Sequence, residues 1–240
     1  RKGVIVGDRV KLDGDVSGAG GSLARIVEVE ERRTWLRRSA DDIDTFERPI
    51  VANADQLMIV TALADPEPRT GMIDRILVAA YDAQVSPILC LTKADLASPD
   101  ELRTAYTPLD IPIIVIHPGS DLYPVRSLLE HHVTVLIGHS GVGKSTLVNA
   151  LVPGTGRATG AVSDVTGKGR HTSTSAAAIA LPNGGWIIDP PGVRSFGISH
   201  VRAEAFIGAF PDLEDIVTDC PRGCRHDSSA PECALDEAVR

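Results

Sequence analysis

The 240-residue sequence lacks the marks of a membrane or secreted protein. No apolar run approaches the roughly 20 residues that a membrane-spanning helix needs. Arg1-Lys2-Gly3-Val4 carries no secretory signal, so we expect a cytoplasmic protein without a membrane partner. The chain also lacks an initiator methionine, and we expect it to begin inside a longer protein. Its four cysteines are too few for a disulfide scaffold.

The sequence also lacks an overall excess of basic residues. The formal net charge of −8 argues against a protein that binds nucleic acid by charge alone. Most of the acidic excess lies in residues 196–240, which hold nine acidic and four basic residues. The arginine pairs at 32–33 and 37–38 are typical of a solvated strand face, or of a contact with RNA phosphates, and RNA binding stays open.

The pattern of the chain divides it into three zones, which we take as domains. Residues 1–48 alternate short β-branched runs with turns, such as 4–6, 9–12, 24–29 and 34–36, and predict a small antiparallel sheet or barrel ending in an acidic linker, 39–47. Residues 49–196 alternate strands and helices, which predicts a mostly parallel α/β sheet with helices on both faces. Residues 197–240 predict a short helical segment, 201–210, and then a Cys/His cluster.

In the central zone, six apolar runs have the length of strands and three segments favour helices. The predicted strands are Leu57–Leu63, Pro87–Leu91, Pro112–His117, Thr134–Gly138, Ala176–Leu181 and Trp186–Asp189. The predicted helices cover 72–80, 121–131 and 144–151, the first from an apolar stripe at helical spacing.

A phosphate-binding loop follows the fourth predicted strand. Gly138-His139-Ser140-Gly141-Val142-Gly143-Lys144-Ser145 matches Gly-x4-Gly-Lys-Ser/Thr between a strand and a helix, the context that this motif requires. Its backbone N–H groups would cradle phosphate. Lys144 would reach the β- and γ-phosphates, and the Ser145 hydroxyl would bind Mg²⁺.

A base-reading motif follows the second predicted strand. Thr92-Lys93-Ala94-Asp95 has the Asn/Thr-Lys-x-Asp form found in guanine-specific GTPases. The Asp95 carboxylate would accept hydrogen bonds from guanine, while the stem of Lys93 lies along the ring. Adenine offers no matching pair of donors, so an unpaired carboxylate would disfavour ATP. A P-loop ATPase in which this tetrapeptide is a coincidence is the alternative.

The last strand ends in Asp189-Pro190-Pro191-Gly192, which matches the Asp-x-x-Gly motif of GTPases. Asp189 would hold Mg²⁺ through water, and the Gly192 amide would sense the γ-phosphate. The preceding loop offers a switch threonine, for which Thr172 is the first candidate and Thr174 the second. Because the base-reading motif precedes the phosphate loop, the order of motifs is that of a circularly permuted GTPase.

The C-terminal zone holds the pattern Cys-x3-Cys-x-His-x6-Cys. Three thiolates and an imidazole, Cys220, Cys224, Cys233 and His226, suit a closed, structural Zn²⁺ site. Cys90 lies in an apolar strand and is expected in the core.

With these motifs, the chain closely resembles the ribosome small-subunit-dependent GTPase A family over essentially its whole length. The residues 169–172 also contribute to this resemblance. The resemblance implies an N-terminal OB-fold, incomplete here, a permuted GTPase domain and a zinc domain. It also implies a role in late maturation of the small ribosomal subunit, with binding to its ribosomal RNA and GTP hydrolysis stimulated by that subunit. Nothing in the sequence demands a dimer, and we expect a monomer.

The expected site therefore has three groups of residues. The GTP/GDP-binding residues are Thr92, Lys93, Asp95, Gly138, His139, Ser140, Gly141, Val142, Gly143, Lys144, Ser145, Thr146, Asp189 and Gly192. Mg²⁺ would be held by Ser145, Thr172 and Asp189, and catalysis would use Lys144, Thr172 and His171.

His171 is expected to orient the attacking water. Val193 stands where Ras-like GTPases place a glutamine, and an apolar side chain cannot orient water. A neutral imidazole can hydrogen-bond and orient the attacking water. The competing interpretation is that His171 is a loop histidine that contacts RNA or solvent. The alternative function is a non-hydrolysing RNA-binding assembly factor that uses GTP as a switch ligand.

Overall fold

A six-stranded sheet forms the centre of the chain. The computed structural model describes residues 3–17, 19–39, 47–154, 176–190, 197–199, 201, 207, 210–226 and 230–238. The strand order is β7-β6-β5-β8-β10-β9, and only β9 runs antiparallel to its neighbour. The strands are β5 (Gln56–Ala62), β6 (Ser86–Thr92), β7 (Ile113–Val115), β8 (Val133–Ile137), β9 (Ala177–Ala180) and β10 (Trp186–Asp189).

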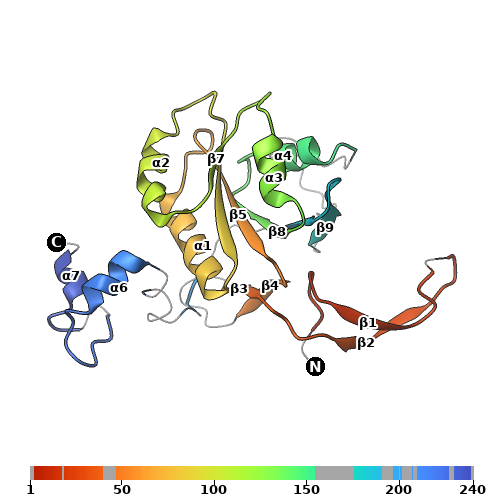
Figure 1. Ribbon diagram of the computed structural model, residues 1–240, viewed down its shortest axis with the longest axis horizontal. Coiled ribbons are helices and arrows are strands. Elements are labelled where there is room, and N and C mark those ends of the chain that lie inside the picture. The colour runs from red at the N-terminus through yellow and green to blue at the C-terminus, as the bar shows by residue number, and fades with distance from the viewer. Residues whose placement is uncertain are drawn as a thin grey trace, which may run out of the picture.

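Helices cover both faces of this sheet (Figure 1). They are α1 (Thr70–Asp82), α2 (Asp100–Tyr106, followed by a 3-10 turn, Thr107–Leu109), α3 (Tyr123–Leu129) and α4 (Lys144–Leu151). Leu57 and Ile59 of β5 belong to the buried cluster that includes α1, whereas Met58 and Val60 belong to the cluster that includes α3 and α4. A strand buried on both faces is apolar at every position, which explains the continuous apolar runs of the sequence.

The prediction of a mostly parallel α/β sheet is confirmed, and all six predicted strands are present with ends that differ by at most two residues. The helix at 144–151 is confirmed, and α1 contains the predicted apolar stripe. Helix α3 is shorter than predicted. Helix α2 was not predicted, because only Leu102 and Tyr106 of its seven residues are buried and two positions do not make a periodic pattern. The predicted segment 201–210 lies mostly outside the described residues.

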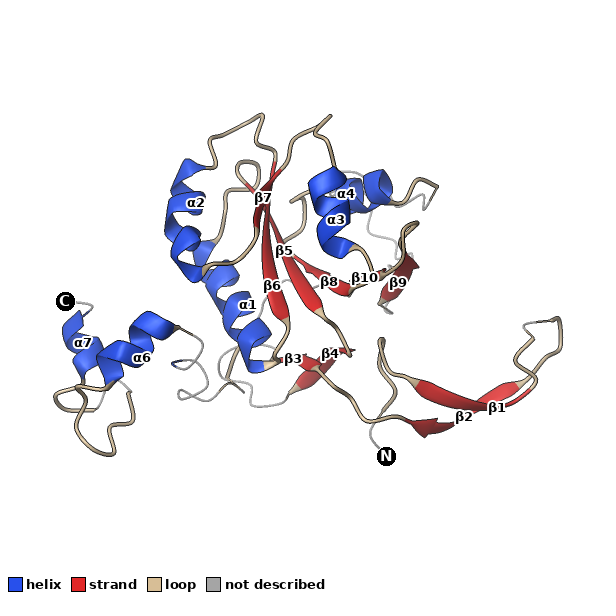
Figure 2. Ribbon diagram, in the orientation of Figure 1, coloured by secondary structure: helices blue, strands red, loops and turns tan. Residues whose placement is uncertain are grey.

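The N-terminal zone forms two separate antiparallel pairs of strands (Figure 2). They are β1 (Val10–Gly14) with β2 (Ala24–Val29), and β3 (Trp35–Arg38) with β4 (Arg48–Ala52). Among the described residues these strands do not close into a barrel. The run from Val4 to Val6 is not a strand, because the backbone nitrogen of Ile5 donates to the Asp8 carboxylate 2.8 Å away and the chain turns there.

The β3–β4 hairpin packs on the central sheet. Leu36 of β3 and Val51 of β4 are fully buried, in the same cluster as Ile59 of β5. By contrast, Leu12 and Ile26 of the first hairpin are 50% and 47% exposed. Strand β4 of the second hairpin crosses the domain boundary that we predicted between residues 48 and 49. That boundary stays a prediction.

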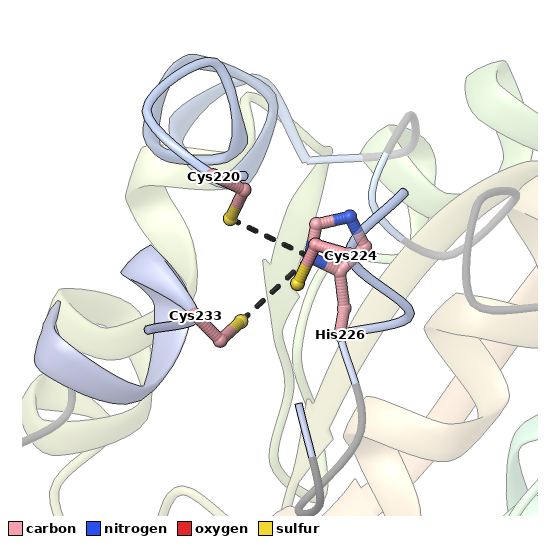
Figure 3. Close-up of side chains that lie close together, drawn as sticks. All are labelled: Cys220, Cys224, His226 and Cys233. Carbon is pink, nitrogen blue, oxygen red and sulfur yellow. Dashed lines mark hydrogen bonds between the residues drawn. The ribbon is translucent and has the colours of Figure 1, made fainter. Parts of the chain in front are cut away.

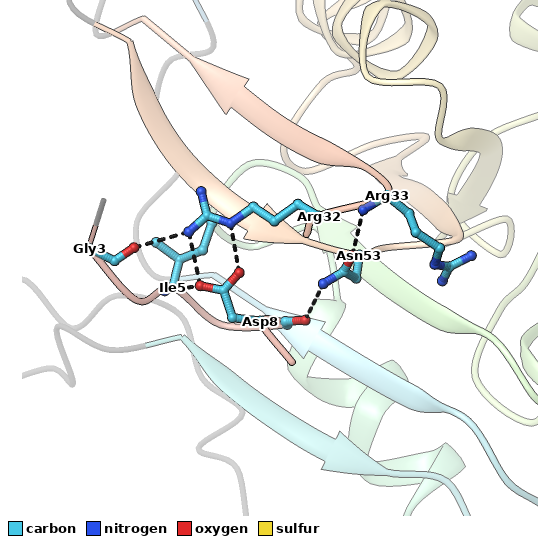
Figure 4. A network of polar contacts seen from close by, with 7 residues as sticks. Gly3, Ile5, Asp8, Arg32, Arg33 and Asn53 are labelled. Carbon is cyan, nitrogen blue, oxygen red and sulfur yellow. Dashed lines mark hydrogen bonds and ion pairs between the residues drawn. The ribbon is translucent and has the colours of Figure 1, made fainter. Parts of the chain in front are cut away.

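A polar network joins the N-terminal zone to the central sheet (Figure 4). The Arg32 guanidinium contacts the Asp8 carboxylate at 2.7 Å, and only 1% of the Asp8 side chain is exposed. Burial acts to raise the pKa of Asp8, but the hydrogen bonds from Arg32 and Ile5 outweigh it and hold the pKa below its ordinary value. The Asn53 side chain accepts from the Arg33 amide at 2.8 Å and donates to the carbonyl of Gly7 at 2.9 Å.

Two more arginines reach carboxylates of the central domain. Arg33 pairs with Asp55 at 3.0 Å, and Arg37 pairs with Asp82, at the end of α1, at 3.1 Å. The arginines that we considered for RNA contacts are thus largely engaged within the chain.

Two described elements of the C-terminal half remain. Helix α6 (Pro211–Val217) and helix α7 (Ala234–Ala238) belong to the C-terminal zone, and Tyr81 of α1 meets Phe210 edge to face with ring centroids 5.6 Å apart. Among the residues described, none of the helices combines the length and the apolarity that crossing a bilayer requires.

If the β3–β4 hairpin belongs to the core of the sheet, Leu36→Ala should lower the free energy of unfolding by about 2–5 kcal/mol, because it leaves a cavity in a fully buried cluster. Leu12→Ala, the same change at an exposed position of β1, should cost less than about 1 kcal/mol. Urea unfolding followed by circular dichroism measures both, and equal losses would contradict this assignment.

Candidate nucleotide site and metal cluster

The phosphate loop connects β8 to α4, as the motif requires. A Cβ atom at Gly138 would lie 2.1 Å from the carbonyl oxygen of Val60 in β5, so no larger residue fits there. Gly141 and Gly143 have positive φ angles of 83° and 96°. Helix α4 begins at Lys144, so the loop lies at a helix N-terminus, where backbone N–H groups and the helix dipole favour an anion.

The side chain of Lys144 is folded back over this loop. Its ammonium donates to the carbonyl oxygens of Gly138 at 2.5 Å and His139 at 2.9 Å. Burial lowers the pKa of Lys144, and the charge of Asp189 acts in the opposite direction. Asp189 lies at the carboxyl end of β10, which pairs in parallel with β8, so the third motif reaches the same edge of the sheet as the phosphate loop.

The base-reading motif contacts the phosphate loop directly. Thr92 ends β6 and is buried, and its hydroxyl donates to the carbonyl oxygen of Val142 at 2.6 Å. Two motifs that lie 50 residues apart in the chain are thereby joined at one point. Asp95 is exposed, so its carboxylate is open to a ligand. The structure thus brings Thr92–Asp95, Gly138–Ser145 and Asp189 together.

Ser145 and Thr146 lie in the first turn of α4, directly after the glycines of the loop. His171, Thr172, Thr174 and Gly192 lie outside the described residues, so their roles stay predictions.

Two segments at the same edge of the sheet were not predicted from the sequence. One is the loop after β7, where the backbone nitrogen of Ala94 donates to the carbonyl of Ile116 at 3.2 Å and that of His117 donates to the Ser120 hydroxyl at 2.9 Å. The other is the segment 63–69 after β5. The signal that could have found them is topological, because loops after adjacent parallel strands meet at the carboxyl edge of a sheet.

The C-terminal cysteines and histidine gather into one cluster. The ligand atoms of Cys220, Cys224, His226 and Cys233 all lie within 4.8 Å of one another, and the four side chains point toward one another (Figure 3). The Nδ1 atom of His226 is 3.6 Å from the Cys220 sulfur and 3.7 Å from that of Cys233. The contact with His226 lowers the pKa of Cys233, which favours a thiolate.

This donor set, three sulfurs and one nitrogen, could hold a metal ion. Cys90 is fully buried in β6, as predicted, and burial raises the pKa of its thiol to about 12, which suits a core residue and not a ligand.

Comparison with known proteins agrees with this arrangement. The family model "RsgA GTPase" matches residues 29–199. A protein of Azotobacter vinelandii named "Small ribosomal subunit biogenesis GTPase RsgA" is 40% identical over 245 aligned positions, which cover 98% of this chain and 69% of that protein. A relative with the same name in Pseudomonas aeruginosa is 39% identical, over 98% of this chain and 70% of its own length. The chain belongs to the RsgA GTPase family.

Two solved structures share its fold. The crystal structure of YjeQ from Thermotoga maritima has a TM-score of 0.71 and 28% identity, and the match covers 99% of this chain and 78% of the other. A structure described as that of YloQ, a circularly permuted GTPase, has a TM-score of 0.65 and 24% identity, over 99% and 74% of the two chains.

Membership in the RsgA GTPase family and the order of motifs along the sheet identify the central domain as a circularly permuted P-loop GTPase domain. The predicted fold class is therefore confirmed for this domain.

The bond from Thr92 to Val142 gives a test of the joined site. Thr92→Val removes the hydroxyl and leaves the carbonyl of Val142 without its partner, so affinity for GTP and GDP should fall about fivefold. Thr134→Val is the matched control, since Thr134 is also buried but its hydroxyl bonds to the side chain of Gln56 instead. Titration with a fluorescent GDP measures both, and an equal effect of the two changes would contradict a specific role for Thr92.

Proposed function

We propose that this RsgA-family GTPase binds the small ribosomal subunit and acts in its late maturation, hydrolysing GTP to GDP and phosphate when the subunit stimulates it. The observation that carries the nucleotide-binding part of the proposal is the 2.6 Å hydrogen bond from Thr92 to Val142, because it joins the base-reading and phosphate-binding motifs. The names of the curated relatives support the assignment to small-subunit biogenesis.

Each residue group has a defined task in hydrolysis. The Asp95 carboxylate selects guanine, the N–H groups of Gly141 to Ser145 hold the β-phosphate, and Lys144 neutralises charge on the γ-phosphate. Ser145, Thr172 and Asp189 would hold Mg²⁺, for which a hydroxyl and carboxylate donor set is suited. That ion would supply charge neutralisation at the phosphates.

Orientation of the attacking water is the remaining requirement. The Lys144 ammonium donates to loop carbonyls and has no lone pair, so it cannot accept a hydrogen bond from water. The side chain of Val193 is apolar and cannot accept one either. We assign the role to His171. Because Val193 stands in the position of the water-orienting glutamine, we expect a slow intrinsic rate of hydrolysis that a ribosomal activator raises.

The C-terminal cluster is proposed to bind one structural Zn²⁺ ion through Cys220, Cys224, His226 and Cys233. Three thiolates and an imidazole leave no open position at a tetrahedral ion, and helices α6 and α7 are too short to bury a core of their own. We propose that this zinc domain and the N-terminal OB-fold-like domain contact ribosomal RNA, and that the protein is a cytoplasmic monomer.

Turnover of GTP by the purified protein tests the function, measured with and without small ribosomal subunits and with ATP in parallel. Subunits should raise the rate of GTP hydrolysis at least about tenfold, because binding of an activator can complete the arrangement of catalytic groups around the nucleotide. ATP should not be hydrolysed. His171→Ala should abolish the stimulation and leave GDP affinity unchanged. Tight GTP binding without stimulation would favour the non-hydrolysing assembly factor instead.

Metal analysis by mass spectrometry tests the zinc site. The purified chain should carry one zinc ion, and Cys220→Ser should lose it, because the site then lacks one of its thiolates. Cys90→Ala, a change at the one cysteine outside the cluster, should keep the ion. A full zinc complement in the Cys220 variant would refute the assignment.

A further inference from the structure

The seven residues 63–69 connect β5 to α1 and lie between the two motifs of the nucleotide site. The segment begins beside the base-reading loop, where the backbone nitrogen of Leu63 donates to the carbonyl of Thr92 at 3.0 Å. It ends at Arg69, directly before α1. None of the sequence motifs includes these residues.

At the base-reading loop, the segment holds the end of the Lys93 side chain. The Lys93 ammonium donates to the carbonyl oxygen of Asp65. Both residues have a left-handed backbone, with φ of 58° at Lys93 and 45° at Asp65. This conformation is unfavourable for residues other than glycine, and such residues are concentrated at ligand sites. The carbonyl of Asp65 therefore holds the ammonium end of Lys93, the residue whose stem is expected to lie along the guanine ring.

At the phosphate loop, the same segment passes beside a glycine. The Cδ atom of Pro66 lies 3.6 Å from the position that a Cβ of Gly141 would take, so the proline ring is the neighbour on the side of Gly141 where a side chain would project. Further along, Glu67 and Arg69 line a small cavity together with Gly138 and His139. One segment thus contacts the loop that reads the base and lies beside the loop that binds phosphate.

We propose that residues 63–69 are a third loop of the nucleotide site, in which the main-chain carbonyl of Asp65 positions Lys93 and Pro66 lies beside Gly141. The proposal rests on the proposed binding of guanine nucleotides. Because GTP and GDP share the base and the β-phosphate, the segment contributes equally to the affinity for both and leaves the hydrolysis step unchanged.

The test uses a substitution at Asp65 that strains the backbone and so changes the orientation of its carbonyl. A β-branched residue is strongly disfavoured at a left-handed φ, so Asp65→Val should rotate the carbonyl away from Lys93. Affinity for GDP and for a non-hydrolysable GTP analogue should each fall about tenfold, the loss expected for a hydrogen bond to a charged group. The rate of single-turnover hydrolysis at saturating GTP should not change. Asp65→Asn tolerates the conformation and should restore most of the affinity.

Two controls separate positioning from general damage. Gln84→Val places the same strain at another exposed residue of left-handed backbone (φ 56°), outside the nucleotide site, and should not weaken nucleotide binding. In a Lys93→Met background, Asp65→Val should have no further effect, because its partner is already gone.

Additive losses in that double-mutant cycle, or wild-type affinity in a folded Asp65→Val variant, would overturn the proposal. If Asp65→Val does not fold, as judged by its melting temperature, Asp65→Ala replaces it in the same cycle. Failure of the unaltered protein to bind GTP would instead overturn the proposed function.

Discussion

The hydrogen bond from the Thr92 hydroxyl to the carbonyl of Val142 is the contact on which the nucleotide site depends. It is made in the buried interior, where losing one partner leaves an unsatisfied polar atom and costs about 1–3 kcal/mol. The bond fixes the position of the base-reading loop relative to the phosphate-binding loop, as the binding of one nucleotide by both loops requires. The parallel sheet makes the bond possible, because β6 and β8 lie on either side of β5 and end at the same edge.

The circular permutation changes what this sheet is connected to. In the chain order found here, β10 and Asp189 come last, so the segment that follows Asp189 leads toward the metal cluster. On the other side, the N-terminal zone is fastened to the base of the sheet by Arg33 and Arg37, and the fully buried Leu36 anchors its second hairpin. Ser39, directly after β3, donates its amide to the carbonyl of Gly197 at 3.1 Å, and its hydroxyl accepts from the amide of Ser199 at 3.2 Å. The N-terminal zone thus contacts the chain beyond Asp189 at Ser39.

The sequence predicted the parts of the molecule in which chemistry restricts the choice of residues. The phosphate loop, Asp189 and the cysteine cluster were found because each needs particular residue types at a fixed spacing. The inner strands β5, β6 and β8 were found because burial on both faces requires apolar residues at nearly every position. Helix α2, strand β4 and the segment 63–69 were missed for the converse reason. Strand β4 includes Arg48 and Pro49, and the segment 63–69 acts through a main-chain carbonyl that any residue could supply.

The central claim is that the permuted sheet forms one guanine-reading site, and the nucleotide selectivity of Asp95→Asn tests it most directly. An amide at this position cannot accept two hydrogen bonds from guanine, but it can donate one to the second carbonyl of xanthine. The account predicts that the Asp95→Asn variant binds xanthosine diphosphate more tightly than GDP, whereas the unaltered protein shows the opposite preference. An unchanged preference for GDP in the variant would contradict the account.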